Sequence, residues 1–233
     1  MSKIYFGSDF HFGHFNVIEY CRRPWKTVEE MNDAMVEIIN KTVKEDDTFY
    51  ILGDISLNPK WMEFLMERII CKTVYLIVGN HDSCFEKKLG AKPEKTAKMR
   101  ERYFKAGIKD IRTELWITLK KPGILGSKIK EKLYHVQLCH FPFAPKPDTI
   151  NNGDIRYLSN RPIDKGQILL HGHSHSFHRK NGRMIDVGFD GDLKIFSEQD
   201  IITLIEDERE YIPSPITEYY NSRKESLIKK DEY

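Results

Sequence analysis

The sequence lacks paired cysteines and any long apolar run. Its four cysteines form no CxxC pair, and three of them lie inside otherwise apolar stretches, so we expect buried thiols in a reducing compartment. The N-terminal residues lack the positive flank and apolar core of a signal peptide, and no segment is apolar for long enough to cross a bilayer. We therefore expect a cytoplasmic protein that does not associate with membranes. The cysteines are Cys21, Cys71, Cys84 and Cys139.

The sequence also has little net charge. Its 37 lysines and arginines nearly balance 35 aspartates and glutamates, and so mild an excess does not by itself indicate nucleic acid as a partner. With 40% hydrophobic residues, the 233-residue chain is long enough for one well-buried core. We expect one domain over residues 1–205, followed by a charged tail over residues 206–233 that is docked on the surface or partly disordered.

The first third of the chain alternates apolar, β-branched runs with helical patterns, which predicts a βαβαβ arrangement. A capping box from Thr27 to Glu30 and the pair Asn58-Pro59 mark two helix starts. In this part we expect strands at 3–8, 48–52 and 73–78, and helices at 28–43 and 59–70. Beyond it we expect a helical segment at 86–109 and strands at 111–119, 133–139, 167–170, 183–187, 193–196 and 201–205.

Polar side chains stand where several of these strands end, which is the edge at which open α/β sheets bind ligands. Residues at positions i and i+2 of an extended chain share a face, so Asp9 and His11 can reach one cation. The imidazoles of His173 and His175 have the same spacing. Carboxylate, amide and imidazole donors without thiolate suit manganese, iron, zinc or nickel. The strand-end residues are Asp9, His11, Asp54, Asn80, His81, Asp82, His140, His173 and His175.

These residues form five blocks, and the order of the blocks is more specific than any one of them. In chain order they read DxH, GD, GNHD, a strand-end His and GHxH, starting at Asp9, Gly53, Gly79, His140 and Gly172. In this order they resemble the calcineurin-like metallophosphoesterase superfamily from Ser8 to Val187. The resemblance implies a single α/β domain in which two packed mixed β-sheets are flanked by helices, as an α/β/β/α sandwich.

The resemblance also implies a role for each residue in a site with two divalent ions, which are manganese, iron, zinc or nickel. One ion would take Asp9, His11 and His175 as ligands, and the other would take Asn80, His140 and His173. Asp54 would bridge the two ions, whereas Asp82 would fix the loop. His81 would be the catalytic histidine, outside the metal shell, that protonates the leaving oxygen.

The substrate class is less narrowly defined. The protein-phosphatase branch carries a second aspartate where this sequence has Leu57, which disfavours a Ser/Thr phosphatase. We expect a phosphodiesterase. The alternatives are a phosphomonoesterase acting on a small metabolite or nucleotide, a nuclease suggested by the Lys-rich stretches 87–105 and 120–132, and a non-catalytic metal-binding scaffold. The intact ligand set disfavours the scaffold, and the sequence does not indicate an oligomeric state.

Three further residues are candidates for contact with the substrate phosphate. His14 follows the first ligand pair on the same loop, and Arg156 and Arg161 precede the GHxH block. Each is either a phosphate contact at the rim of the pocket or a solvated loop residue. The remaining histidines, His135, His171 and His178, belong to no block, and we expect them in the core or on the surface.

Overall fold

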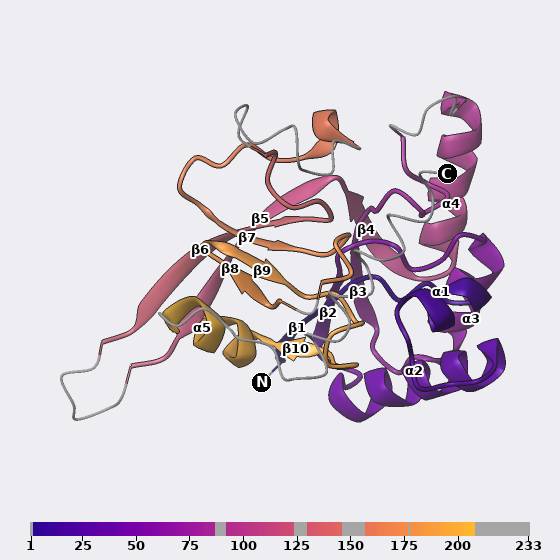
Figure 1. Cartoon of the computed structure of the whole chain (residues 1–233), viewed down its shortest axis with the longest axis horizontal. Coiled ribbons are helices and arrows are strands. Elements are labelled where there is room, and N and C mark those ends of the chain that lie inside the picture. Colours follow the sequence, from indigo (N-terminus) through magenta and orange to yellow (C-terminus); the bar gives the residue numbers. More distant parts are fainter. Residues whose placement is uncertain (1, 87–91, 124–129, 146–156, 177, 208–233) are drawn as a thin grey trace, which may run out of the picture.

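Two five-stranded β-sheets, each mixed, lie at the centre of the fold and are flanked by helices (Figure 1). The computed structural model describes residues 2–86, 92–123, 130–145, 157–176 and 178–207. This arrangement confirms the expected α/β fold with two packed sheets. None of the helices in these ranges is long and apolar enough to span a membrane.

The first sheet has the strand order β10-β1-β2-β3-β4. Strands β1 to β4 are parallel to one another, and β10 runs antiparallel to β1. Parallel strands need crossover connections, and helices between the strands supply them. The strands are β1 (Ile4–Gly7), β2 (Thr48–Ile51), β3 (Thr73–Ile77), β4 (Ile108–Arg112) and β10 (Phe196–Ser197).

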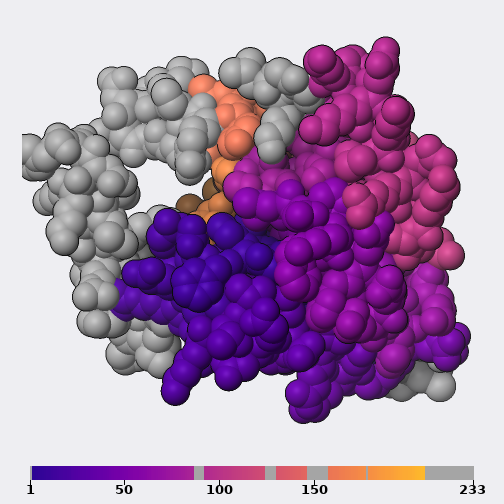
Figure 2. Space-filling model, turned by 90° about the vertical axis from the view of Figure 1, so that its right-hand side faces the viewer, coloured from indigo at the N-terminus to yellow at the C-terminus, as the bar shows by residue number. Residues whose placement is uncertain are grey.

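Four helices cover one face of this sheet, and in Figure 2 the N-terminal part of the chain, coloured indigo to magenta, forms most of that side of the molecule. The expected capping box starts α2, because the Thr27 side chain accepts from the Glu30 N–H and Glu30 accepts from the Thr27 N–H. Asn58 caps α3 before a first-turn proline, as expected. The helices are α1 (Phe15–Tyr20), α2 (Val28–Thr42), α3 (Pro59–Arg68) and α4 (Pro93–Lys105).

The second sheet has the strand order β5-β6-β7-β9-β8. A long antiparallel pair, β5 with β6, continues into parallel neighbours β7 and β9, and the short β8 closes the edge. Helix α5 (Glu198–Glu206) buries Ile201 and Ile202 among residues of both sheets. The strands are β5 (Glu114–Lys121), β6 (Lys132–Cys139), β7 (Ile168–His171), β8 (Lys180–Asn181) and β9 (Met184–Asp186).

The alternation of side chains along the central strands divides the core in two. In β2, Phe49 and Ile51 pack with the helices, whereas the next residue, Leu52, packs between the sheets. Strand β1 does the same with Tyr5 toward the helices and Phe6 toward the second sheet. Because both faces of these strands are covered, their sequences read as nearly continuous apolar runs.

Three expectations about the later part of the chain are wrong. The segment 111–119 is not one strand: β4 ends at Arg112 in the first sheet and β5 begins at Glu114 in the second. The segment 201–205 is helical, because Ser197 and Asp200 form a capping box and the adjacent Ile201 and Ile202 are both buried. The strand expected at 193–196 is the two-residue β10 instead.

Other expectations fall largely outside the described residues. Of the tail expected at 206–233, only Glu206 and Asp207 are described, and Glu206 ends α5. The division into a domain and a tail therefore stays a prediction. All four cysteines are free thiols, three of them buried, as expected.

Phe10 lies between two predicted ligands but faces the core, and it is 0% exposed. Its ring lies 5.9 Å, 6.2 Å and 5.5 Å from the rings of Phe12, Phe49 and Phe189. We expect Phe10→Ala to lower the free energy of unfolding by about 3–5 kcal/mol, because it leaves a cavity. Urea denaturation measures this, with Phe15→Ala as the control at a 60% exposed ring. Equal losses in the two variants would contradict the packing described here.

Candidate metal centre

The loops at the ends of strands from both sheets meet at one place. Because β1, β2 and β3 are parallel, the residues after them lie at the same edge of the first sheet. The segments that follow β1 and β2 lie side by side. The N–H groups of Asp9 and His11 in the first segment donate to the carbonyls of Gly53 and Asp54 in the second. A bridge between Ser8 and Gly188 brings the second sheet to this edge. The seven predicted ligands therefore come from two sheets.

Asp9, His11 and His175 form the first group of predicted ligands. The rings of His11 and His175 stack with their centroids 5.0 Å apart. The donor atoms of the three side chains lie within 4.8 Å of one another, close enough for one cation. Both carboxylate oxygens of Asp9 also accept from the backbone N–H of His173, at 3.1 Å and 3.0 Å.

Asn80, His140 and His173 form the second group. Nε2 of His140 lies 3.2 Å from the Asn80 side-chain oxygen, and the rings of His140 and His173 are 5.2 Å apart. Nδ1 of His140 lies 2.7 Å from the carbonyl oxygen of Leu52. Donation of the Nδ1 proton to that carbonyl leaves Nε2 as the lone-pair donor.

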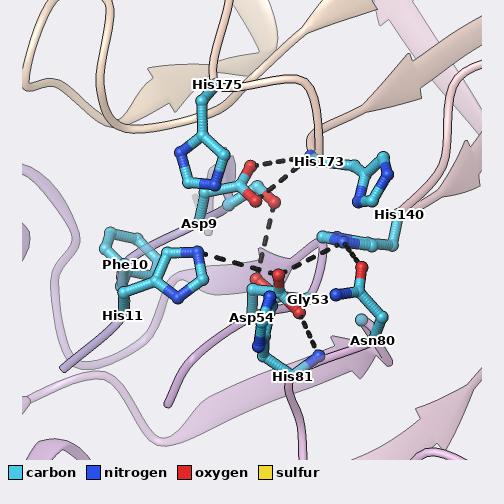
Figure 3. Close-up of polar contacts among 12 residues, drawn as sticks. Asp9, Phe10, His11, Gly53, Asp54, Asn80, His81, His140, His173 and His175 are labelled. Atoms are coloured by element: carbon cyan, nitrogen blue, oxygen red, sulfur yellow. Dashed lines mark hydrogen bonds and ion pairs between the residues drawn. The ribbon is translucent and has the colours of Figure 1, made fainter. Parts of the chain in front are cut away.

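Asp54 lies between the two groups (Figure 3). Its Oδ2 is 3.7 Å from Nε2 of His11 in the first group and 3.5 Å from Nε2 of His140 in the second. Its Oδ1 accepts from the backbone N–H of His81 at 2.8 Å. The His81 ring stands edge-on to His11, 5.2 Å between centroids, so the predicted proton donor lies beside the ligand groups.

The glycines of three blocks, Gly53, Gly79 and Gly172, leave space for close contacts with the predicted ligands. A side chain at Gly53 would place its first carbon 2.5 Å from Nδ1 of His140. Side chains at Gly79 and Gly172 would collide with the carboxylates of Asp54 and Asp9. The glycines of the GD, GNHD and GHxH blocks are thus required by close packing, against the His140 ring for Gly53 and against carboxylates for Gly79 and Gly172.

Five of the predicted ligands have left-handed backbone conformations. This region disfavours residues other than glycine, and each such residue costs on the order of 1–3 kcal/mol. Such strain concentrates at functional sites, where surrounding contacts hold it in place. The φ values are 58° for Asp9, 52° for His11, 54° for Asp54, 68° for His173 and 46° for His175.

Asp82 fixes the loop, as expected from the GNHD block. Its Oδ2 accepts from the N–H groups of Asp54 and Gly79, and its Oδ1 accepts from the N–H of Ile55. These bonds join the ends of β2 and β3. Burial, reinforced by the charge of Asp54, raises the pKa of Asp82 to about 7.

The electrostatics of the site suit bound cations. Burial raises the pKa of Asp9 to about 6, and a divalent ion between the carboxylates would favour their charged forms. Burial lowers the pKa of His11 and His140, which keeps both imidazoles neutral, as metal binding requires. Both ring nitrogens of His11 are buried with no hydrogen-bond partner among the described residues. The residues therefore fit divalent metal ions.

Of the three residues expected to contact the substrate phosphate, the structure describes His14 and Arg161. His14 is partly exposed, with its ring 5.8 Å from that of His11. Arg161 follows the short helix Leu158–Asn160, whose preceding residue Tyr157 packs edge-on against His173 at 5.8 Å. Arg156 lies outside the described residues. His171 is buried, and His135 and His178 are exposed, as expected for histidines outside the blocks.

The sequence analysis missed two residues behind the site. Asp190 lies 2.5 Å from Nδ1 of His175, and Arg23 is paired with Asp190. The hydrogen bond with Asp190 raises the pKa of His175 well above its ordinary value, against the opposing effect of burial. Neither residue belongs to a motif block, and 167 positions separate them in the sequence.

The comparison with protein families decides the class. A family model described as calcineurin-like phosphoesterase matches residues 2–177. The chain belongs to the calcineurin-like phosphoesterase family. It is a metal-dependent phosphoesterase, which confirms the resemblance read from the five blocks.

Two proteins similar in sequence come from an archaeon and a phage, and one similar structure comes from a bacterium. The protein MJ1445 of Methanocaldococcus jannaschii is 43% identical over 90 residues, 37% of this chain and 51% of that protein, so the chain spans about half the length of that relative. The Gene 66 protein of Mycobacterium phage L5 is 29% identical over 224 residues, 88% of this chain and 95% of that protein. AQ665 of Aquifex aeolicus, a protein of unknown function, covers 88% of this chain and 100% of its own with a TM-score of 0.53 and 20% identity, which shows a shared fold.

Gly79→Ala tests the packing of the site. The added methyl group collides with the Asp54 carboxylate, so we expect affinity for Mn²⁺ to fall on the order of 10–100-fold. Gly182→Ala is the control, because its methyl group meets nothing within 4 Å, although φ is +59°. Equilibrium dialysis measures both. Unchanged Mn²⁺ binding in Gly79→Ala would contradict the close approach of Asp54 to this loop.

Proposed function

We propose that the chain hydrolyses phosphodiesters with two divalent metal ions held by the seven predicted ligands. The observation that carries this proposal is the position of Asp54, whose Oδ2 lies 3.7 Å and 3.5 Å from one histidine of each ligand group. A carboxylate so placed can hold a cation on either side. The ligands are Asp9, His11, Asp54, Asn80, His140, His173 and His175.

Two bound ions would supply an activated water near neutral pH and would neutralise charge on the phosphoryl oxygens. Oxygen and nitrogen donors without thiolate favour manganese, iron, zinc or nickel, and we propose manganese as the activating ion in solution. Cys21 lies 3.4 Å from Nδ1 of His175, but burial raises the pKa of its thiol. A neutral thiol is a poor metal ligand, so Cys21 is not among the proposed donors.

His81 is the proposed general acid. Its backbone N–H donates to Asp54, which ties the position of the residue to the carboxylate between the ligand groups. Its ring stands beside His11 and is partly exposed, so it can face a substrate bound at the same place. A positioned acid of this kind contributes on the order of 10²–10⁴ in rate by protonating the leaving oxygen.

The charges around the site favour a diester over a monoester. A phosphomonoester carries about −1.5 to −2 charges at pH 7, and the second charge needs a further cation. Arg23 is buried and engaged by Asp190, Asp9 and Phe10, so its charge does not serve a substrate. His14 and Arg161 are the proposed contacts of the single phosphate charge among the described residues, and Arg156, outside them, stays a further proposed contact.

A nuclease is the less favoured alternative. Several lysines of the stretches that suggested it are paired with acids: Lys105 with Glu101, Lys120 with Glu131, and Lys121 with Glu206. Such pairs reduce the positive potential available to a nucleic-acid backbone. We propose a small or extended phosphodiester as substrate, and a cytoplasmic location, which the free cysteines support.

A substrate panel tests the diesterase proposal. With Mn²⁺ present, we expect a higher kcat/KM on bis-p-nitrophenyl phosphate than on p-nitrophenyl phosphate, and loss of both activities with a chelator. The two esters share a leaving group, so the comparison isolates the charge of the phosphate. A higher value for the monoester would favour the phosphomonoesterase, and faster cleavage of single-stranded DNA or RNA would favour the nuclease.

His81→Ala tests the acid. We expect turnover to fall on the order of 10²–10⁴-fold on a diester with an alkoxide leaving group, because that oxygen needs a proton. On a p-nitrophenyl ester we expect a much smaller loss, since that group leaves without protonation. His178→Ala is the control at an exposed histidine. Equal losses on both esters would indicate that His81 positions the phosphate instead.

A further inference from the structure

Arg23 and Asp190 form a buried ion pair behind the predicted ligands. Nε of Arg23 donates to Oδ1 of Asp190 at 2.7 Å, and the two side chains are 0% and 1% exposed. Burying two charges carries a desolvation penalty that further hydrogen bonds must offset. The remaining donors and acceptors of the pair therefore indicate what the pair does.

The remaining oxygen and nitrogen contacts of the pair reach the first ligand group or its loop, and Arg23 also contacts the sulfurs of Met31 and Met35 at 3.4 Å and 3.5 Å. The second carboxylate oxygen of Asp190 lies 2.5 Å from Nδ1 of His175. The other two guanidinium nitrogens of Arg23 donate to the backbone carbonyls of Phe10 and Asp9, at 2.6 Å and 2.7 Å. One guanidinium thus binds both the loop that carries Asp9 and His11 and the carboxylate that binds His175.

We propose that Arg23 and Asp190 are positioning residues for one of the two metal sites. Asp190 accepts the Nδ1 proton of His175 and so leaves Nε2 as the metal donor, which is the usual role of a carboxylate behind a ligating histidine. Arg23 fixes Asp190 and sets the distance between His175 and the loop of Asp9 and His11. This inference rests on the proposed function, because it takes these three ligands to share one ion.

A competing reading makes the same atoms a separate cation site. Cys21, His175 and Asp190 each place a donor atom within 4.8 Å of the others. However, the guanidinium of Arg23 already lies 2.7 Å from Asp190, and a second cation beside that carboxylate would meet its repulsion. The two readings differ in the number of ions bound per chain.

Co²⁺ titration of the full chain, followed by equilibrium dialysis and visible absorption, tests the proposal. Wild type should bind two ions. Asp190→Asn removes the charge but keeps the shape, and we expect it to weaken one site on the order of 10–100-fold and leave the other unchanged. In a His175→Ala background the same substitution should cause no further loss, because Asp190 acts through that imidazole.

The matched control is Asp192→Asn, an aspartate two positions away that accepts from Arg179 at 3.1 Å instead, and it should bind both ions as wild type does. If Asp190→Asn does not fold, Arg23→Lys, which keeps the charge and loses the planar fork, should weaken the same site. Wild-type affinity in the variants, an equal loss without His175, or a third ion per chain would overturn the proposal. Fewer than two ions in wild type would contradict the proposed function itself.

Discussion

Three buried carboxylates, Asp9, Asp54 and Asp82, lie close together at the ends of β1, β2 and β3. Many contacts around them offset the free-energy cost of burying these charges side by side. Like charges in a buried site repel one another and lose their hydration. Hydrogen bonds from backbone N–H groups offset part of this cost, and Asp82 alone accepts three of them. The neutral His11 and His140 beside Asp54 do not neutralise the charge, whereas divalent cations at this edge would.

The two sheets contribute different parts of this arrangement. The first sheet supplies the three carboxylates and Asn80, whereas the second supplies three of the histidines, His140, His173 and His175. Neither sheet alone offers a full set of donors. Because the predicted ligands from the two sheets meet near the Ser8–Gly188 bridge, metal binding there and the packing of one sheet on the other would stabilise each other.

The sequence was sufficient to predict the fold class and the family, and the residues it named lie together at one edge of the sheets, but it did not predict every element. Parallel strands with polar residues after them are a local pattern, and the order of the five blocks identified the family. The change of sheet at Thr113 has no glycine or proline to mark it, and the β-branched run in α5 reads equally as a strand. Asp190 was missed because it belongs to no block and because its ion-pair partner Arg23 lies 167 positions away.

The left-handed backbone at five predicted ligands has a consequence for the stability of the fold. Glycine or asparagine adopts this conformation at lower cost than aspartate or histidine, so the site is a place where function opposes thermal robustness. Replacing His11, Asp54 or His173 with glycine would relieve backbone strain and remove a predicted metal donor in the same change. Backbone stability and metal affinity would therefore change in opposite directions at these positions.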